Sequence, residues 1–304
     1  MSQLTLMSQL TLEIREVARR LLRDKQVQVV IGFERGSLPM RSRPCFIRRE
    51  EDVDRLVWDG FCETNLARYL PNRKEKAAIV AKGCDSRALV ELIKENQVVR
   101  DQVVIIGVPC KGMTDRSLIE AKTDRGLMVE DDGTVLLAHC EACTHRDPVL
   151  HDLLVGQPGG EVLNDEFSDV EEFGALDHDA RFAYLAQQMR KCIRCYACRN
   201  ACPLCYCPEC FVDGSQPQWV GKSTRLSDTM VFHLVRAFHL AGRCVSCGAC
   251  ERACPVGVDI RKLNRKLQKD VKDLFHHEAG LSLEEVSPLA TFRTDDPGPP
   301  MVDP

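Results

Sequence analysis

The chain has 304 residues, and its 45 acidic and 41 basic side chains leave a net charge of −4. This balance gives no basic footprint for nucleic acid, and an aromatic fraction of 6% argues against a platform that stacks single-stranded bases. No run of about 18 apolar residues and no signal-peptide core are present, so we expect a cytoplasmic protein without a membrane span. Seventeen cysteines in such a chain point to thiols that bind metal rather than pair.

The N-terminal half reads as alternating helices and strands. In chain order we expect a helix over Leu12–Asp24, a strand over Val27–Gly32, a helix opening at Asp52–Trp58, a strand over Lys76–Ala81, a helix over Arg87–Asn96 capped by Asp85 or Ser86, and a strand over Val103–Ile106. A strand, helix and strand within about 30 residues form a βαβ unit, so the last two strands should be parallel.

The C-terminal half reads as mainly helical. Helices are expected over Ser227–Ala241 and over Arg261–His276, and the second is rich in Lys and Arg. We predict an α/β N-terminal domain with parallel strands, joined to a mainly helical, cysteine-rich domain. The expected boundaries are a leader helix at 1–24, the α/β domain at 25–160, an acidic linker at 161–180, the cysteine-rich domain at 181–280 and an extended tail at 281–304.

Two cysteine runs share one spacing, in which three cysteines at three-residue intervals precede a fourth cysteine followed by proline. This is the bacterial ferredoxin pattern, whose fourth cysteine ligates the other cluster when two clusters are present. The pattern predicts two 4Fe-4S sites and makes the mainly helical domain at 181–280 a ferredoxin-like iron-sulfur domain. Site A consists of Cys192, Cys195, Cys198 and Cys254, and site B consists of Cys244, Cys247, Cys250 and Cys202. Zinc is less consistent with this spacing, because its sites usually read as separated Cys-x-x-Cys pairs.

Basic residues surround these ligands, and positive charge near an anionic cluster stabilises its reduced form. The basic residues are Lys191, Arg194, Arg199, Arg243 and Arg252, although some of them can also be read as solvated surface groups. For His233 and His239 we expect a structural or hydrogen-bonding role rather than a ligand role.

Five further cysteines have no clear partner set. Cys205, Cys207 and Cys210 form a possible further metal site, which would need another ligand such as Cys45, Cys62 or a histidine, and zinc is one candidate occupant. The alternative is that these thiols only pack, as small apolar side chains do.

Four cysteines of the N-terminal half form another candidate set. Cys84 and Cys110 directly follow the two parallel strands, at the sheet edge where α/β proteins place ligands. Downstream, Cys140 and Cys143 form a Cys-x-x-Cys pair. Four such thiols can hold one more 4Fe-4S cluster, while Cys84 or Cys110 taken singly can equally be a buried packing residue.

The segment from about Lys82 to Leu154 resembles the iron-sulfur domain of the beta subunits of deazaflavin coenzyme F(420)-reducing hydrogenase and formate dehydrogenase. The resemblance lies in the turn Gly83-Cys84-Asp85 that opens a helix, in the strand that ends at Cys110 and in the later Cys-x-x-Cys. It implies a third 4Fe-4S cluster, at site C, held by Cys84, Cys110, Cys140 and Cys143. The Gly-rich flavin-binding segment of that family is not found here, which argues against FAD and deazaflavin binding.

Residues 191–290 look like the two-cluster modules that accompany heterodisulfide-reductase-like complexes of anaerobes, which pass electrons between a dehydrogenase or hydrogenase and a flavin-containing subunit. With no nucleophile elbow, phosphate loop or dinucleotide motif, the leading hypothesis is a non-catalytic electron-transfer subunit of a cytosolic redox complex. The basic helix and the tail after Ser287 would then offer docking surfaces, and a solvated face is an equally good interpretation of the charges. The alternatives are a flavin-dependent oxidoreductase subunit that reduces deazaflavin or a related carrier, and a zinc-bound structural protein.

Overall fold

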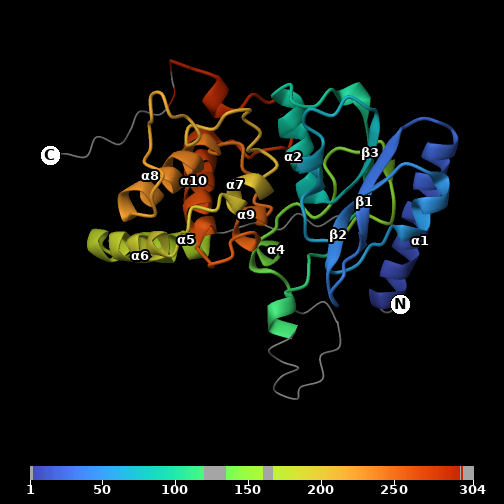
Figure 1. Cartoon of the computed structure of the whole chain (residues 1–304), viewed down its shortest axis with the longest axis horizontal. Coiled ribbons are helices and arrows are strands. Elements are labelled where there is room, and N and C mark those ends of the chain that lie inside the picture. Colours follow the sequence, from blue (N-terminus) through green and yellow to red (C-terminus); the bar gives the residue numbers. More distant parts are fainter. Residues whose placement is uncertain (1–2, 120–134, 160–166, 295, 297–304) are drawn as a thin grey trace. The chain divides into compact units, whose positions relative to one another are not determined.

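The computed structural model describes residues 3–119, 135–159, 167–294 and 296 of the chain (Figure 1). The chain divides into two compact units, Met1–Asp165 and Glu166–Pro304, and each is described by itself. Among the described helices, none combines the length and the apolar character that crossing a membrane requires.

A five-stranded sheet forms the centre of the first unit, with the order β2-β1-β3-β4-β5. Its strands are β1 (Val29–Arg35), β2 (Ser42–Ile47), β3 (Ala77–Ala81), β4 (Val103–Gly107) and β5 (Leu153–Leu154). Pairing is parallel from β1 through β3 and β4 to β5, and β2 alone pairs antiparallel, as a hairpin partner of β1. The expected parallel βαβ unit is therefore present, with Ala77 opposite Val103.

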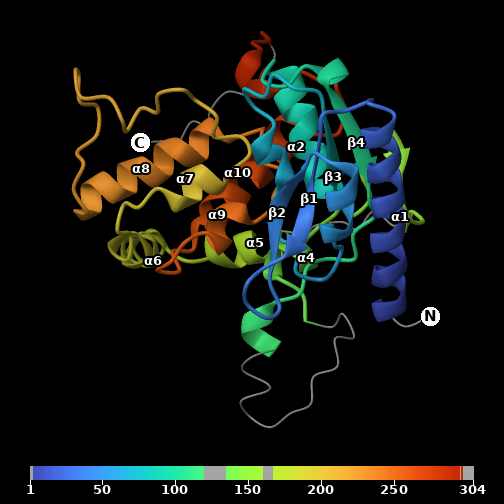
Figure 2. The ribbon, with the colours of Figure 1, turned by 45° about the vertical axis from the view of Figure 1, so that its right-hand side comes forward.

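Helices cover both faces of this sheet. Helix α1 (Gln3–Arg23) contacts β1 and β3, whereas α2 (Gly83–Lys94) contacts β3 and β4. Figures 1 and 2 both show the strands lying between these two helices. Every side chain of β3 is consequently buried, as expected for a central parallel strand. The N-terminal helix is part of this unit rather than a separate leader, because Ile14, Ala18 and Leu21 are buried against it.

Some local expectations differ from the structure. Residues Glu50–Arg55 form a 3-10 helix, as do Leu66–Tyr69 and Arg100–Gln102, so the helix expected at Asp52–Trp58 is a single short turn. Helix α2 begins four residues before the predicted start because Asp85 lies in its first turn and accepts a hydrogen bond from the Lys82 backbone at 2.9 Å. Asp85 thus has the capping function expected of it.

The described regular elements of the second unit are all helices, joined by long loops such as residues 202–225. Its helices are α5 (Ser168–Gly174), α6 (His178–Arg190), α7 (Ala197–Ala201), α8 (Leu226–His239), α9 (Ala249–Arg252) and α10 (Ile260–Phe275), with a 3-10 turn at Pro288–Ala290. The short helices α7 and α9 pack together, and α8 packs against both α6 and α10 (Figure 2). The core gathers Met189, Val212, Phe232, Val258 and Ile260 around two cysteines of site A.

Part of the segment predicted as an acidic linker is folded into this unit. Residues 160–166 lie outside the described part of the chain, but Ser168–Gly174 is helical. The Asp169 carboxylate accepts hydrogen bonds from the guanidinium of Arg265 on α10, at 2.6 Å from Nη2, and Arg265 is 3% exposed. Further charges of α10 pair internally, as in Lys269 with Asp273 at 2.6 Å. The helix predicted to dock partners therefore uses much of its basic charge within its own unit.

Candidate metal centres

The two ferredoxin-type loops have the same backbone shape. In the first loop Arg194 and Tyr196 are left-handed, with φ of 55° and 58°, and the equivalent residues Ser246 and Gly248 have φ of 56° and 65°. Three of these four residues carry a Cβ, which makes the left-handed conformation costly outside glycine. Both loops accept this strain at the same two positions, and each then enters a short helix that carries the third cysteine of its motif.

Backbone N–H groups point at the sulfurs of both loops. The Arg194 N–H donates to Cys192 Sγ at 3.4 Å, and the Val258 N–H donates to Cys254 Sγ at 3.3 Å. In the second loop the Ser246 N–H makes the same contact with the first cysteine of its motif. Such donors stabilise negative charge on sulfur, so the loops suit thiolate ligands.

The fourth cysteine of each run lies with the other run. Cys202 lines one cavity together with Cys244, Cys247 and Cys250. In the same way Cys192 has Cys254 and Cys195 as its electrostatic neighbours among the thiols. The structure therefore brings together the predicted members of sites A and B. Burial raises the pKa of Cys247 to about 12, so binding of metal must displace its proton.

Arg236 of α8 lies among the cysteines, and the sequence did not single it out. It is 4% exposed, its Nη2 donates to the Cys198 carbonyl at 3.2 Å, and its electrostatic neighbours include Cys202 and Cys250. Burial works against its charge, but the surrounding thiols outweigh it and raise the pKa of Arg236. The only sequence signal was its position one helical turn after His233.

His233 occupies the same helix face, and its Nε2 lies 3.3 Å from Cys192 Sγ. Burial lowers the pKa of His233 to about 4, with Arg236 and Arg194 adding to the shift, so the ring is neutral near pH 7. A neutral ring can donate one hydrogen bond to the sulfur. The expected hydrogen-bonding role is in agreement with this geometry, whereas His239 is exposed and contacts the Phe211 ring edge-on.

The remaining cysteines have separate environments. The Cys205 and Cys202 thiols interact directly, and this contact together with Arg236 lowers the pKa of Cys202 although burial opposes it. Cys207 is exposed and Cys210 is half-buried near Arg199 and Asp213. In the first unit Cys45 is buried within β2, and the thiol of Cys62 donates to Asp59 Oδ1 at 3.4 Å. A further metal site at Cys205, Cys207 and Cys210 stays a prediction.

Site C is assembled by a close approach of two backbone segments. Gly83 at the start of α2 lies so near the segment after Cys143 that a Cβ would be 2.2 Å from the His145 carbonyl oxygen. The Cys110 N–H donates to the Arg146 carbonyl at 3.1 Å, which ties the same segment to the end of β4. Only glycine permits the first of these contacts, so the Gly83-Cys84 turn is a structural requirement of the site.

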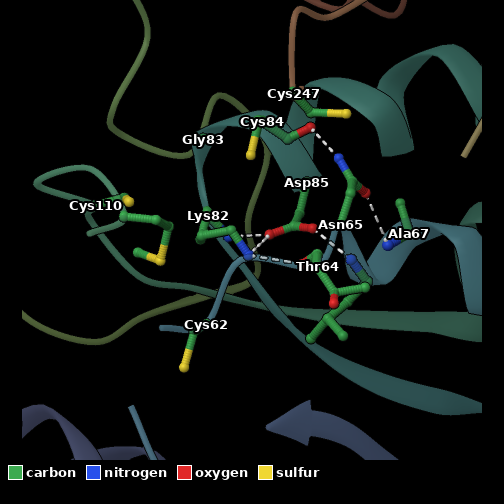
Figure 3. A network of polar contacts seen from close by, with 12 residues as sticks. Cys62, Thr64, Asn65, Ala67, Lys82, Gly83, Cys84, Asp85, Cys110 and Cys247 are labelled. Atoms are coloured by element: carbon green, nitrogen blue, oxygen red, sulfur yellow. Dashed lines mark hydrogen bonds and ion pairs between the residues drawn. The ribbon is translucent and has the colours of Figure 1, made fainter. Parts of the chain in front are cut away.

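Thiols from three different segments meet at this place. Cys140 and Cys143 are electrostatic neighbours of Cys110, and burial raises the pKa of Cys110 to about 12. Backbone donors also reach these sulfurs, from Gly112 to Cys110 at 3.4 Å and from Met113 to Cys140 at 3.3 Å. The structure thus brings Cys110, Cys140 and Cys143 together, and Cys84 shares with Cys110 the nearby charge of Lys82 (Figure 3).

A buried lysine accompanies site C. Lys82 is 2% exposed, its Nζ lies 2.8 Å from Asp85 Oδ2, and its charge acts on Cys84 and Cys110. Burial opposes the charge, but Asp85 and Cys84 outweigh it and raise the pKa of Lys82 above its usual value.

The donor sets suit iron-sulfur clusters. Each of the three sites offers four thiols, and several of the sulfurs accept backbone hydrogen bonds. Within the part of the chain that the structure describes, no three His, Cys, Asp or Glu side chains are arranged to hold a single metal ion.

A cavity of about 590 Å³ adjoins site C within the first unit. Its walls include Trp58, Cys110, Lys111, Arg146 and Gln157. This volume lies within the range of small-molecule sites in proteins. The sequence reasoning did not anticipate it, because its walls come from α1, the turn after β4 and the segment after β5.

Comparison with known proteins places this geometry among iron-sulfur redox subunits. Residues 188–258 match the family described as the 4Fe-4S dicluster domain. The beta subunit of F420-dependent formate dehydrogenase of Methanocaldococcus jannaschii is 25% identical over 342 aligned positions, covering 86% of this chain and 89% of that protein. Subunit beta of F420-dependent formate dehydrogenase 1 of Methanococcus maripaludis is 23% identical over 343 positions, covering 85% and 87%. The expected resemblance to this kind of beta subunit is confirmed, and it extends over most of the chain.

Proposed function

We propose that this chain is the iron-sulfur electron-transfer subunit of a multi-subunit oxidoreductase of formate dehydrogenase type, with 4Fe-4S clusters at sites A, B and C. The observation that carries this proposal is the gathering of three sets of four cysteines in two folded units. When bound, a 4Fe-4S cluster supplies one-electron chemistry that no side chain of the protein provides.

The residues of the chain hold and tune the clusters under this proposal. Cysteines from two runs interlock sites A and B, and α7 and α9 present their third ligands. Arg236 places positive charge beside sulfurs of both sites. Backbone N–H groups favour the thiolate form of the ligands and the reduced state of what they bind.

An experiment with the isolated chain tests the relay function. Anaerobically prepared protein, reduced by dithionite, should pass its electrons to a one-electron acceptor and show no formate oxidation of its own. When the catalytic subunit of the native complex is added, formate should reduce the chain. Formate turnover by the isolated chain would contradict a pure relay role.

The cavity beside Cys110 favours a second candidate function, reduction of a flavin or deazaflavin carrier. The two relatives are named as F420-dependent, and a cavity of about 590 Å³ next to a redox site is where a flavin or deazaflavin ring could accept electrons. Titration of the isolated chain with FAD and with a deazaflavin, followed by absorbance and fluorescence, tests this. Saturable binding with turnover would support it, and no binding up to about 0.1 mM would remove it.

A further inference from the structure

The side chain of Lys82 is buried at the end of β3, where the sequence pattern gives no reason for an ammonium group. Lysine is almost never fully buried unless it is paired, and Lys82 is 2% exposed. Its Nζ lies 2.8 Å from Asp85 Oδ2, donates to the Thr64 carbonyl at 3.0 Å and is 4.6 Å from the centre of the Phe33 ring. Three different groups therefore define one position for this charge, and Figure 3 shows two of them, Asp85 and Thr64.

Asp85 alone does not explain the lysine. Its two carboxylate oxygens already accept backbone hydrogen bonds, from Leu66 at 2.6 Å and from Lys82 at 2.9 Å. Asn65 braces the same turn by donating to the Cys84 carbonyl at 3.1 Å. A carboxylate with such donors is stable at a helix N-terminus without an ammonium partner.

Stability does not explain the ion pair well either. A buried pair recovers little more than the cost of removing both charges from water, and apolar replacements are often as stable. The remaining electrostatic neighbours of the ammonium are thiols, those of Cys84 and Cys110 and, on the other side, that of Cys62. Cys84 and Cys110 belong to site C, so the charge of Lys82 acts on two of the four cysteines of this site.

We propose that Lys82 is a positioning residue that provides a fixed positive charge for site C and raises the reduction potential of the cluster held there. The inference rests on the proposed third cluster. Reduction adds one electron from a one-electron donor, with no bond broken and no proton taken up, and the ion pair with Asp85 keeps the ammonium in place. An added negative charge is stabilised by a nearby ammonium group, which is the physical origin of the shift.

Three lysine variants test this in the full chain by EPR-monitored redox titration with viologen mediators. In K82M the reduction potential of site C should fall by at least about 59 mV, which is a tenfold change in the one-electron equilibrium constant. K82R keeps the charge and should stay close to the wild type. Lys74 is exposed in the same unit, so K74M removes an equal charge from solvent and should change nothing. Sites A and B serve as internal references in every sample.

A fourth variant, D85N, should shift the site C potential in the opposite direction. It leaves the ammonium without its counter-charge, so the potential should rise. In the double variant K82M/D85N the potential should return toward the wild-type value. A potential unchanged in K82M with iron retained would overturn the inference and leave the proposed function intact. Wild-type protein with only about eight irons would remove site C and the inference together. If K82M loses about four irons that K82R keeps, the charge itself holds the cluster; loss in both variants would overturn the inference.

Discussion

Sites A and B differ from site C in how their cysteines come together. In the second unit three cysteines of each proposed site come from a single loop of seven residues, and only the fourth is distant. In the first unit Cys84, Cys110 and the Cys140 pair come from three segments that a parallel sheet aligns. A local loop can wrap a cluster before a fold exists, whereas a sheet edge must be built first.

The two units differ in what supports them as well. The core of the second unit includes Cys192 and Cys198, and its helices α7 and α9 have five and four residues. The first unit has an all-apolar central strand covered on both faces. From this comparison we expect the second unit to need metal for its folding, whereas the first unit should stay folded without metal.

Removing metal should break this comparison most visibly. After anaerobic chelation we expect amide protection in the second unit to fall by about 10³-fold or more, because cluster binding supplies its folding free energy. Amides of β3 and β4 should change by less than about tenfold. Hydrogen exchange read by mass spectrometry checks both, and equal loss in the two units would contradict the assigned roles.

Ligand variants should sharpen the comparison site by site. C202S and C254S should each lose about four irons, from sites B and A, and should lower the stability of the second unit. C84S should also lose about four irons but leave the EPR signals of sites A and B unchanged. Cys45 is a buried thiol outside all three sites, so C45A is the matched control. A C254S variant that affects only site B would disprove the exchanged fourth ligands.

Removing an ion pair should have a smaller, purely structural effect on the second unit. D169N leaves Arg265 buried without its carboxylate and should cost about 2 to 3 kcal/mol of unfolding free energy, discounted because Asp169 is partly exposed. D273N in the exposed pair with Lys269 should cost much less, because exposed ion pairs contribute little to stability. Denaturant unfolding of the metal-loaded protein measures both, and equal costs would contradict this assignment.

The Asp169–Arg265 pair also makes the stability of the protein depend on pH. Burial opposes its charge, but the Arg265 guanidinium outweighs this and holds the pKa of Asp169 below its ordinary value. A lowered folded pKa stabilises the protein above the unfolded pKa of about 4, and the gain is lost as pH falls through the folded value. The difference between wild type and D169N should therefore stay constant from about pH 8 to pH 5 and should not grow on acidification.

The smallest expected effect concerns His233. H233F removes a hydrogen bond to Cys192. Since such a bond contributes about 1 kcal/mol, the one-electron equilibrium constant for reducing site A should fall about fivefold, and its reduction potential should fall with it. H239F alters an exposed ring on the same helix and serves as its control. An equal shift in both variants would show that the helix rather than the hydrogen bond matters.

The sequence predicted those parts of the fold that repeat a local pattern. The buried runs of β3 and β4, the helices α2, α8 and α10, and the spacing of the ferredoxin loops all have strong local signals. The sequence did not predict strand β2, because Ser42, Arg43 and Pro44 break the alternation of apolar and polar residues that marks a strand. It did not predict β5, because that strand has only two residues. Both depend on pairing with strands already in place.

The charges at the sites could not be predicted in the same way. Lys82 and Arg236 have the side chains of surface residues, and only the folded chain buries them among thiols. The basic residues that lie near the cysteines in sequence do not all lie beside them in the structure. Arg252 donates to the Cys247 carbonyl at 2.8 Å, whereas Arg199 pairs with Asp213 at 2.9 Å. Three-dimensional position rather than sequence distance decides which charge acts on a sulfur.

Iron and acid-labile sulfide counted per chain, with EPR of the reduced protein, test the central claim most directly. The account predicts about twelve irons and twelve sulfides in anaerobically prepared full-length protein, with the signals of three 4Fe-4S clusters. Fewer than about eight irons per chain, or zinc in place of iron, would contradict it.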